Sequence, residues 1–92
     1  MIRLSRHKGL REYYVTENKR GINPDHASKL ARILDRLDAS VRPSDMDLPG
    51  YHLHQPSGRE KGLWSVRVSG NWRVLFKFEG EDATDFDYLD YH

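Results

Sequence analysis

The hydrophobic spacing of the second half of the chain constrains its fold more than any other feature. Apolar and polar residues alternate over residues 64–68 and again over residues 72–78, and Ser69-Gly70-Asn71 separates the two runs. Such alternation is typical of half-buried β-strands, and Gly beside Asn between two such runs is typical of a tight turn. The pattern therefore predicts a β-hairpin, followed by a third strand over about residues 83–91.

Helix signals dominate the first part of the chain. Asn23 is a good N-cap, Pro24 suits the first helical position, and the apolar residues that follow recur at helical spacing. These features predict a helix over residues 24–39. A shorter helix is predicted over residues 8–17.

Two helices followed by antiparallel strands predict an α+β fold, in which both N-terminal helices pack on one face of a small antiparallel β-sheet. The chain has 92 residues, which suits a single domain spanning residues 1–92. Residues 40–62 contain several Pro and Gly residues, so this segment is expected to be mostly loop, with residues 50–55 as a candidate short strand.

The core face sets the expected register of the hairpin. A three-residue loop at 69–71 places apolar residues opposite one another, in the pairs Val68 and Trp72, Val66 and Val74, and Trp64 and Phe76. The same register puts Arg67 opposite Arg73 on the other face, where like charges repel. Either acids of the third strand, such as Asp85 or Asp87, neutralise the two arginines, or the arginines form an anion site whose natural ligand is phosphate.

The charges are distributed unevenly along the chain. The formal net charge is +1, yet residues 79–92 hold six acidic residues and no Lys or Arg, so the rest of the chain is basic. A basic body suggests a polyanionic partner such as nucleic acid. The alternative is that the acidic end neutralises the basic strands beside it.

Residue types that are missing exclude several classes of protein. The chain contains no cysteine, which excludes a disulfide scaffold, a Cys-type zinc finger and a thiol nucleophile. No apolar run approaches the length of a membrane span, and the N-terminal residues lack the apolar core of a secretory signal. We therefore expect a cytoplasmic protein that does not bind membranes.

RNA cleavage is a chemistry that the polar residues could support. A base removes the 2′-OH proton, an acid protonates the departing 5′-oxygen and cations stabilise the phosphorane, so no metal or cofactor is required. A metal clamp made by His52 and His54 is only weakly indicated, because two histidines alone make a poor site. The candidates for proton transfer are His54, Asp90, Tyr91 and His92. The candidates for charge stabilisation are Arg59, Lys61, Arg67 and Arg73.

The hairpin and the C-terminus together resemble a known family. The run from Gly62 to Phe76, which contains Trp-Ser-Val-Arg-Val and Trp-Arg, and the terminal Asp90-Tyr91-His92 resemble the HigB toxins of the RelE/ParE-like superfamily of bacterial toxin–antitoxin systems. Further segments extend the resemblance to nearly the whole chain: His7-Lys8-Gly9-Leu10, Asn23-Pro24, Leu37-Asp38-Ala39 and Leu53-His54. The resemblance implies a RelE-like, microbial-ribonuclease-like fold.

The resemblance also implies an activity and partners. HigB-like toxins cleave translated mRNA in the A site of the ribosome and thereby arrest translation. A helix-turn-helix antitoxin of the HigA type neutralises them, and the toxin–antitoxin complex binds its own operator DNA. By this resemblance the catalytic positions of the present chain are His54, Arg73, Asp90, Tyr91 and His92.

One position departs from the family pattern. Ser57 stands where a loop lysine is expected, so Arg59 or Lys61 would have to supply that charge, and the activity would be weaker if neither does. The residues expected to bind RNA phosphate are Ser57, Arg59, Lys61, Arg67 and Asn71. The residues expected to contact ribosomal RNA are Lys8, Arg11, Lys19, Arg20, Lys29, Arg32 and Arg36.

Chemistry assigns a role to each expected catalytic residue. His92 beside Asp90 transfers protons, and Arg73 stabilises the phosphorane. His54 is either the second proton-transfer group or a phosphate ligand, and Tyr91 orients or stacks on a base. Three other functions stay open: a ParE-like gyrase-inhibiting toxin, a non-catalytic RNA- or ribosome-binding module, and a toxin that has lost its activity.

Overall fold

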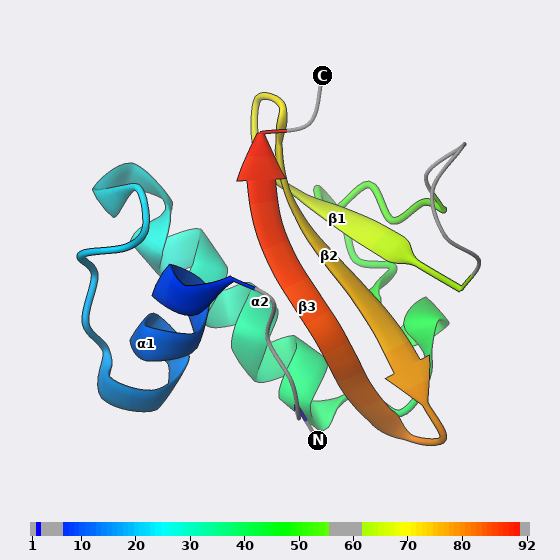
Figure 1. Cartoon of the computed structure of the whole chain (residues 1–92). Helices are drawn as coiled ribbons and strands as arrows, with labels where there is room; N and C mark the ends of the chain where they lie inside the picture. Colours follow the sequence, from blue (N-terminus) through cyan, green and yellow to red (C-terminus); the bar gives the residue numbers. More distant parts are fainter. Residues whose placement is uncertain (1, 3–6, 56–61, 91–92) are drawn as a thin grey trace.

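A computed structural model describes residue 2, residues 7–55 and residues 62–90 of the chain. Its three strands form one antiparallel sheet in the order β1-β2-β3, and both α-helices lie on the same side of that sheet (Figure 1). The elements are α1 (Lys8–Thr16), η1 (Pro24–His26), α2 (Ala27–Ala39), η2 (Pro43–Met46), β1 (Trp64–Ser69), β2 (Trp72–Glu79) and β3 (Asp82–Asp90). This arrangement confirms the predicted α+β fold.

Side-chain caps account for where the two helical stretches begin. The His7 ring accepts a hydrogen bond at Nδ1 from the backbone N–H of Leu10, at 3.0 Å, and so caps α1. Asn23 Oδ1 accepts from the N–H of Asp25 at 2.9 Å, as its N-cap role predicts. The first turn after Asn23 is a 3₁₀ helix, so the predicted helix over 24–39 divides into η1 and α2.

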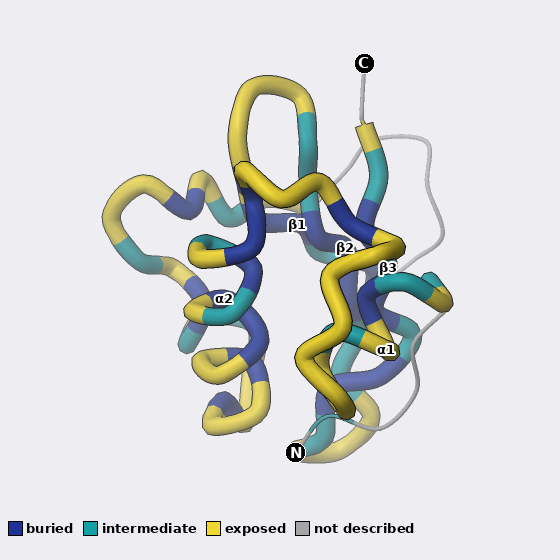
Figure 2. The backbone as a smooth tube through the Cα atoms, turned by 90° about the vertical axis from the view of Figure 1, so that its left-hand side faces the viewer, coloured by how far each residue is buried: buried dark blue, intermediate teal, exposed yellow. Residues whose placement is uncertain are grey.

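The hydrophobic core lies between the helices and the sheet. Figure 2 shows buried residues on the side of α2 that faces the sheet and exposed residues on its outer side. The residues at helical spacing in α2 are the ones that become buried, as the periodicity predicts. The core residues of the helices are Leu10, Ala27, Leu30, Ile33, Leu34 and Leu37, and those of the sheet include Val66, Val74, Phe76, Phe86 and Tyr88.

A close backbone contact holds α1 against the segment that leads into η1. A Cβ atom on either Gly9 or Gly21 would overlap the backbone of the other residue. Glycine at both positions therefore lets the two segments approach more closely than any side chain would permit.

The hairpin keeps the predicted register along most of its length. Trp64 lies opposite Phe76, Val66 opposite Val74, and Arg67 opposite Arg73. The predicted pair of Val68 with Trp72 is wrong, because Ser69 lies opposite Trp72 and the register shifts between Arg67 and Ser69. An extra residue in β1 shortens the turn to Gly70-Asn71, with Gly70 in the left-handed region at φ 56°, while the rest of the ladder is unchanged.

A second irregularity lies between β2 and β3. The register shifts between Leu75 and Lys77, and Asp85 adopts a left-handed conformation with φ 53°. Isolated bridges also cover part of each sheet edge, with Ile2 parallel to Ala83 and His54 antiparallel to Ser65. The candidate strand over 50–55 therefore contributes a single bridge rather than a full strand.

None of the helices in the described part of the chain is long and apolar enough to cross a membrane.

Candidate functional site

The segment before the hairpin lies along the outer edge of β1. The backbone N–H of His54 donates to the carbonyl of Ser65 at 3.1 Å, and the N–H of Ser65 donates back to the carbonyl of His54 at 2.9 Å. Further along the strand, the N–H of Arg67 donates to the carbonyl of Tyr51 at 2.6 Å. These bonds fix the exposed His54 residue beside the sheet.

Side chains from three segments meet at this edge. The Nδ1 atom of His54 lies 2.9 Å from Ser65 Oγ, and Nη1 of Arg73 donates to the same oxygen at 3.2 Å. Arg73 also donates to the carbonyl of His52 at 3.3 Å. We call these side chains the His54–Ser65–Arg73 cluster. Two of its members, His54 and Arg73, are site residues predicted from the sequence.

Further positive charge gathers beside the cluster. Arg67 lies opposite Arg73 in the hairpin, and Nζ of Lys29 lies 4.8 Å from the centroid of the Tyr51 ring. The pKa of Lys29 is lowered, first by burial and then by the neighbouring charges of Arg32 and Arg67. Cations from α2 and from the hairpin therefore act on one another at the same edge of the sheet, which favours an anionic partner there.

The acids proposed to neutralise the arginine pair occupy defined places on β3. Asp87 lies opposite Leu75, and its Oδ1 accepts a hydrogen bond from the backbone N–H of Tyr88 at 2.8 Å. Asp85 lies in the irregular part of the ladder. The anion site formed by Arg67 and Arg73 stays a proposal.

Two other predicted site residues lie away from the cluster. Asp90 ends β3 opposite Trp72, whereas its neighbour Leu89 lies opposite Arg73. Because side chains alternate along a strand, Asp90 is directed to the face opposite that of Arg73. Asn71 lies in the exposed hairpin turn. The predicted residues Ser57, Arg59, Lys61, Tyr91 and His92 lie outside the described residues.

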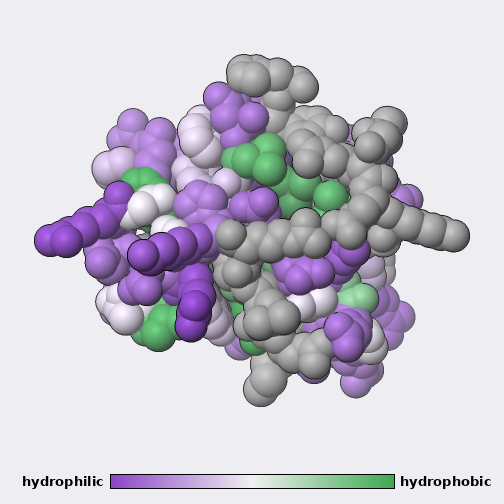
Figure 3. Space-filling model, in the orientation of Figure 1, coloured by the Kyte–Doolittle hydropathy of each residue, from purple (hydrophilic) through white to green (hydrophobic). Residues whose placement is uncertain are grey.

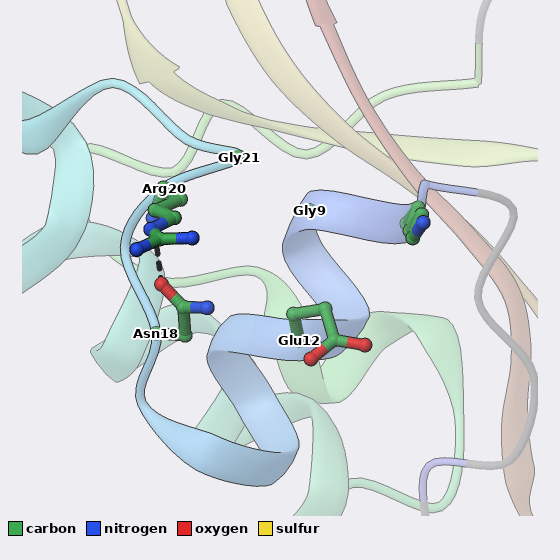
Figure 4. Close-up of a pocket in the computed structure, with 6 residues that line it drawn as sticks. Gly9, Glu12, Asn18, Arg20 and Gly21 are labelled. Atoms are coloured by element: carbon green, nitrogen blue, oxygen red, sulfur yellow. Dashed lines mark hydrogen bonds between the residues drawn. The ribbon is translucent and has the colours of Figure 1, made fainter.

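The basic residues predicted to contact ribosomal RNA are spread over α1, α2 and the loop between them. Lys8 and Arg20 line a cavity of about 400 Å³ together with Gly9, Glu12, Asn18 and Gly21 (Figure 4). On α2, Arg32 donates to Ser28 Oγ at 3.2 Å and Arg36 donates to the carbonyl of Asp45 at 3.0 Å. Lys8, Arg11, Lys19, Arg20, Arg32 and Arg36 are all exposed.

Figure 3 shows how hydrophilic and hydrophobic side chains are distributed over one face of the molecule. Hydrophilic side chains cover the side of the molecule on which α1 lies, and a smaller hydrophobic patch shows beside the upper half of β3 (Figure 3). This side of the molecule is thus mostly polar.

The histidine pair does not keep the alternation of a regular strand. His52 adopts a left-handed conformation with φ 48°, so residues 52–54 do not form a regular extended strand. Within residues 2, 7–55 and 62–90, no group of three or more His, Asp or Glu side chains could hold a metal ion.

Sequence reasoning missed Ser65. It lies among the polar residues that alternate with the apolar ones in β1, yet its exposure is only 1%. The residue is buried because the segment around His54 pairs with β1, and this pairing is a long-range contact that the alternation does not reveal. A serine within a strand next to an arginine is a weak signal by itself.

Comparison with known proteins agrees with this fold. Two helices on one side of a three-stranded antiparallel sheet suit a RelE-like toxin, and the chain belongs to the HigB-like toxin family, the RelE-like toxins of type II toxin–antitoxin systems, which it matches over residues 4–92. It is 30% identical over 92 residues to endoribonuclease HigB of Proteus vulgaris, with all of both chains covered. The family resemblance predicted from the sequence is thereby confirmed.

Two further relatives extend the comparison. The chain is 31% identical over 87 residues to toxin HigB-1 of Vibrio cholerae serotype O1, which covers 92% of this chain and 90% of the relative. It is 34% identical over 64 residues to an uncharacterized protein of Haemophilus influenzae, which covers 68% of this chain and 62% of the relative.

Proposed function

We propose that this toxin is an endoribonuclease that cleaves translated mRNA in the A site of the ribosome and so arrests translation. The observation that carries the proposal is the His54–Ser65–Arg73 cluster, which places an imidazole and a guanidinium at one edge of the sheet. The full-length similarity to an endoribonuclease HigB supports the same activity.

The chemistry of the cluster suits attack by the RNA 2′-OH on the adjacent phosphate. A guanidinium donates several hydrogen bonds in a fixed plane and matches the oxygens of a phosphate. Arg73 is held by Ser65 Oγ and by the carbonyl of His52, so its position is set before RNA binds. Such preorganised donors stabilise the charge that develops on the phosphorane, and no metal ion is needed.

The family resemblance supplies the other catalytic positions, and chemistry assigns their roles. In this proposal His92, with Asp90 beside it in the chain, transfers protons, Tyr91 orients or stacks on a base, and Arg59 or Lys61 takes the place of the lysine expected at position 57. The products are a 2′,3′-cyclic phosphate, or the 3′-phosphate formed when it opens, and a 5′-hydroxyl.

The proposed partners follow from the same function. A HigA-type helix-turn-helix antitoxin neutralises the toxin in the cytoplasm, and operator DNA is bound only through the toxin–antitoxin complex. The basic residues predicted for this role on α1, on α2 and in the loop between them contact ribosomal RNA, which attracts cations through its phosphates.

The test compares toxin variants in cells that lack the antitoxin. Wild type, Arg73→Ala and His92→Ala are induced, and new 5′ ends are mapped on a translated reporter mRNA. We expect cuts that follow the reading frame in the wild type and a loss of about 100-fold or more in Arg73→Ala, because removing one positioned donor costs that much. Arg42→Ala, at an exposed position outside the site, is the matched control.

Three other results would contradict parts of this proposal. Growth arrest without new 5′ ends would indicate a protein target such as gyrase, which a supercoiling assay then checks. Unchanged cleavage in both site variants would show that the site is assigned wrongly. Normal growth after induction of the wild type would indicate a toxin that has lost its activity.

A further inference from the structure

The Ser65 hydroxyl contacts both of the predicted site residues in the cluster, His54 and Arg73. Its oxygen lies 2.9 Å from Nδ1 of His54 and 3.2 Å from Nη1 of Arg73. The backbone of Ser65 exchanges two further hydrogen bonds with His54, and the whole residue is 1% exposed. Ser65 thus contacts His54 through three hydrogen-bonding groups in a place that excludes water.

The direction of these hydrogen bonds follows from what each group can do. A guanidinium nitrogen carries hydrogens and no acceptor, so Arg73 donates and Ser65 Oγ accepts. The hydroxyl has one hydrogen left, and a buried hydroxyl that donates to nothing is costly. Of the two side chains that contact this oxygen, only His54 can accept, through the lone pair of an unprotonated Nδ1.

We propose that Ser65 is a positioning residue that holds neutral His54 in the tautomer with its hydrogen on Nε2. In that tautomer the ring presents a hydrogen-bond donor to the exposed side of the site. This inference rests on the proposed function, in which His54 is either a proton-transfer group or a phosphate ligand. It selects the second role: His54 donates from Nε2 to a phosphate oxygen beside Arg73, and the base that removes the 2′-OH proton is another group.

Nitrogen NMR of the free toxin tests the tautomer without RNA. At alkaline pH, where neutral imidazole dominates in proteins generally, we expect the ¹⁵N shift of His54 Nδ1 to be that of an unprotonated nitrogen and the shift of Nε2 that of a protonated one. Ser65→Ala is expected to move the two shifts toward each other as the tautomers mix. A protonated Nδ1 in the wild type, or shifts unchanged in Ser65→Ala, would overturn the inference.

Two controls separate positioning from folding. Ser65→Thr keeps the hydroxyl and is expected to retain the wild-type ring shifts. Ser69→Ala removes an exposed hydroxyl from the same strand and is expected to leave both the ring shifts and the cleavage rate unchanged. Thermal unfolding of each variant shows whether the fold persists.

Cleavage by ribosome-bound toxin tests the donor role. The side-chain amide of Gln can place an N–H near the position of Nε2 but cannot transfer a proton at neutral pH. If His54 acts as a donor, His54→Gln should retain about tenfold more cleavage than His54→Ala, since one positioned donor is restored in part. Equal losses in the two variants would reject the donor role.

The two assays keep this inference separate from the proposed function. If the wild type cleaves no mRNA, the proposed function fails, whereas the NMR result still decides whether Ser65 sets the tautomer. If the wild type cleaves mRNA, Ser65→Ala should slow cleavage about tenfold through loss of positioning, and Ser65→Thr should restore it.

Discussion

At the scale of single residues, the Tyr88 phenol contributes a pH-dependent part of the stability. Its OH lies 2.6 Å from Nδ1 of His26, and its ring stacks on Trp72 at a centroid distance of 4.8 Å. Burial raises the pKa of Tyr88, and a hydrogen bond with the backbone of Asn23 acts in the opposite direction. The folded state therefore favours the protonated phenol, which has consequences at alkaline pH.

The free energy of unfolding should fall as the pH rises above about 10. A folded-state pKa above the unfolded value gives a contribution that is complete below the unfolded pKa and is lost as the pH rises through the folded one. Tyr88→Phe should make this fall shallower, as urea unfolding from pH 8 to pH 11 would show. Tyr14→Phe, at a tyrosine 37% exposed, should have a smaller effect. Equal slopes for wild type and Tyr88→Phe would contradict this role of the phenol.

Asp45 should affect stability at the other end of the pH scale. Its Oδ2 accepts from the N–H of Val41 at 2.9 Å and of Arg42 at 3.3 Å. The bond from Val41 is the main cause that lowers the pKa of Asp45. The carboxylate therefore stabilises the fold above about pH 4, and this contribution is lost as the pH falls.

The variant Asp45→Asn should lose less stability than the wild type when the pH is lowered from 5 to 2. Circular dichroism at fixed temperature would follow the loss, with Ser44→Ala as the control for disturbing the same turn. If Asp45→Asn lost as much stability as the wild type between pH 5 and pH 2, the carboxylate would not stabilise this turn.

At the scale of elements, the contact between α1 and the following loop depends on two glycines. An added Cβ on Gly21 would overlap the backbone of Gly9, so Gly21→Ala must push α1 away from the loop. Overpacking of this kind costs about 1–3 kcal/mol, which urea unfolding would measure. Val15→Ala, at a position 69% exposed on α1, should change stability far less. If Gly21→Ala and Val15→Ala had the same free energy of unfolding, α1 would be able to move away from the loop without loss of stability.

The hairpin illustrates how an element can satisfy two sequence signals at once. The apolar pairs favour one register, and the Gly70-Asn71 turn favours a shorter loop. The register shift between Arg67 and Ser69 allows both the apolar pairs and the two-residue turn. Val68 stays in the core, although no residue of β2 lies opposite it in the ladder. Alternation alone could not reveal this, because a bulge adds a residue without changing the apolar pattern on either side.

At the scale of the whole molecule, the sequence was a good guide to the fold and to part of the site. Helical spacing in α2 and alternation in β1 and β2 reflect which face each element buries, and the removal of apolar surface from water is the dominant driving force of folding. The expected positions of His54 and Arg73 could be proposed because the chain resembles a family over nearly its entire length.

The order of the elements, the faces that they bury and the opposition of Arg67 to Arg73 could all be predicted from the amino-acid pattern, because these features depend on local periodicity. The burial of Ser65 and its place between His54 and Arg73 became evident only in the folded chain. That contact depends on segment 51–54 pairing with the edge of β1, across a loop whose length and path no periodic pattern encodes.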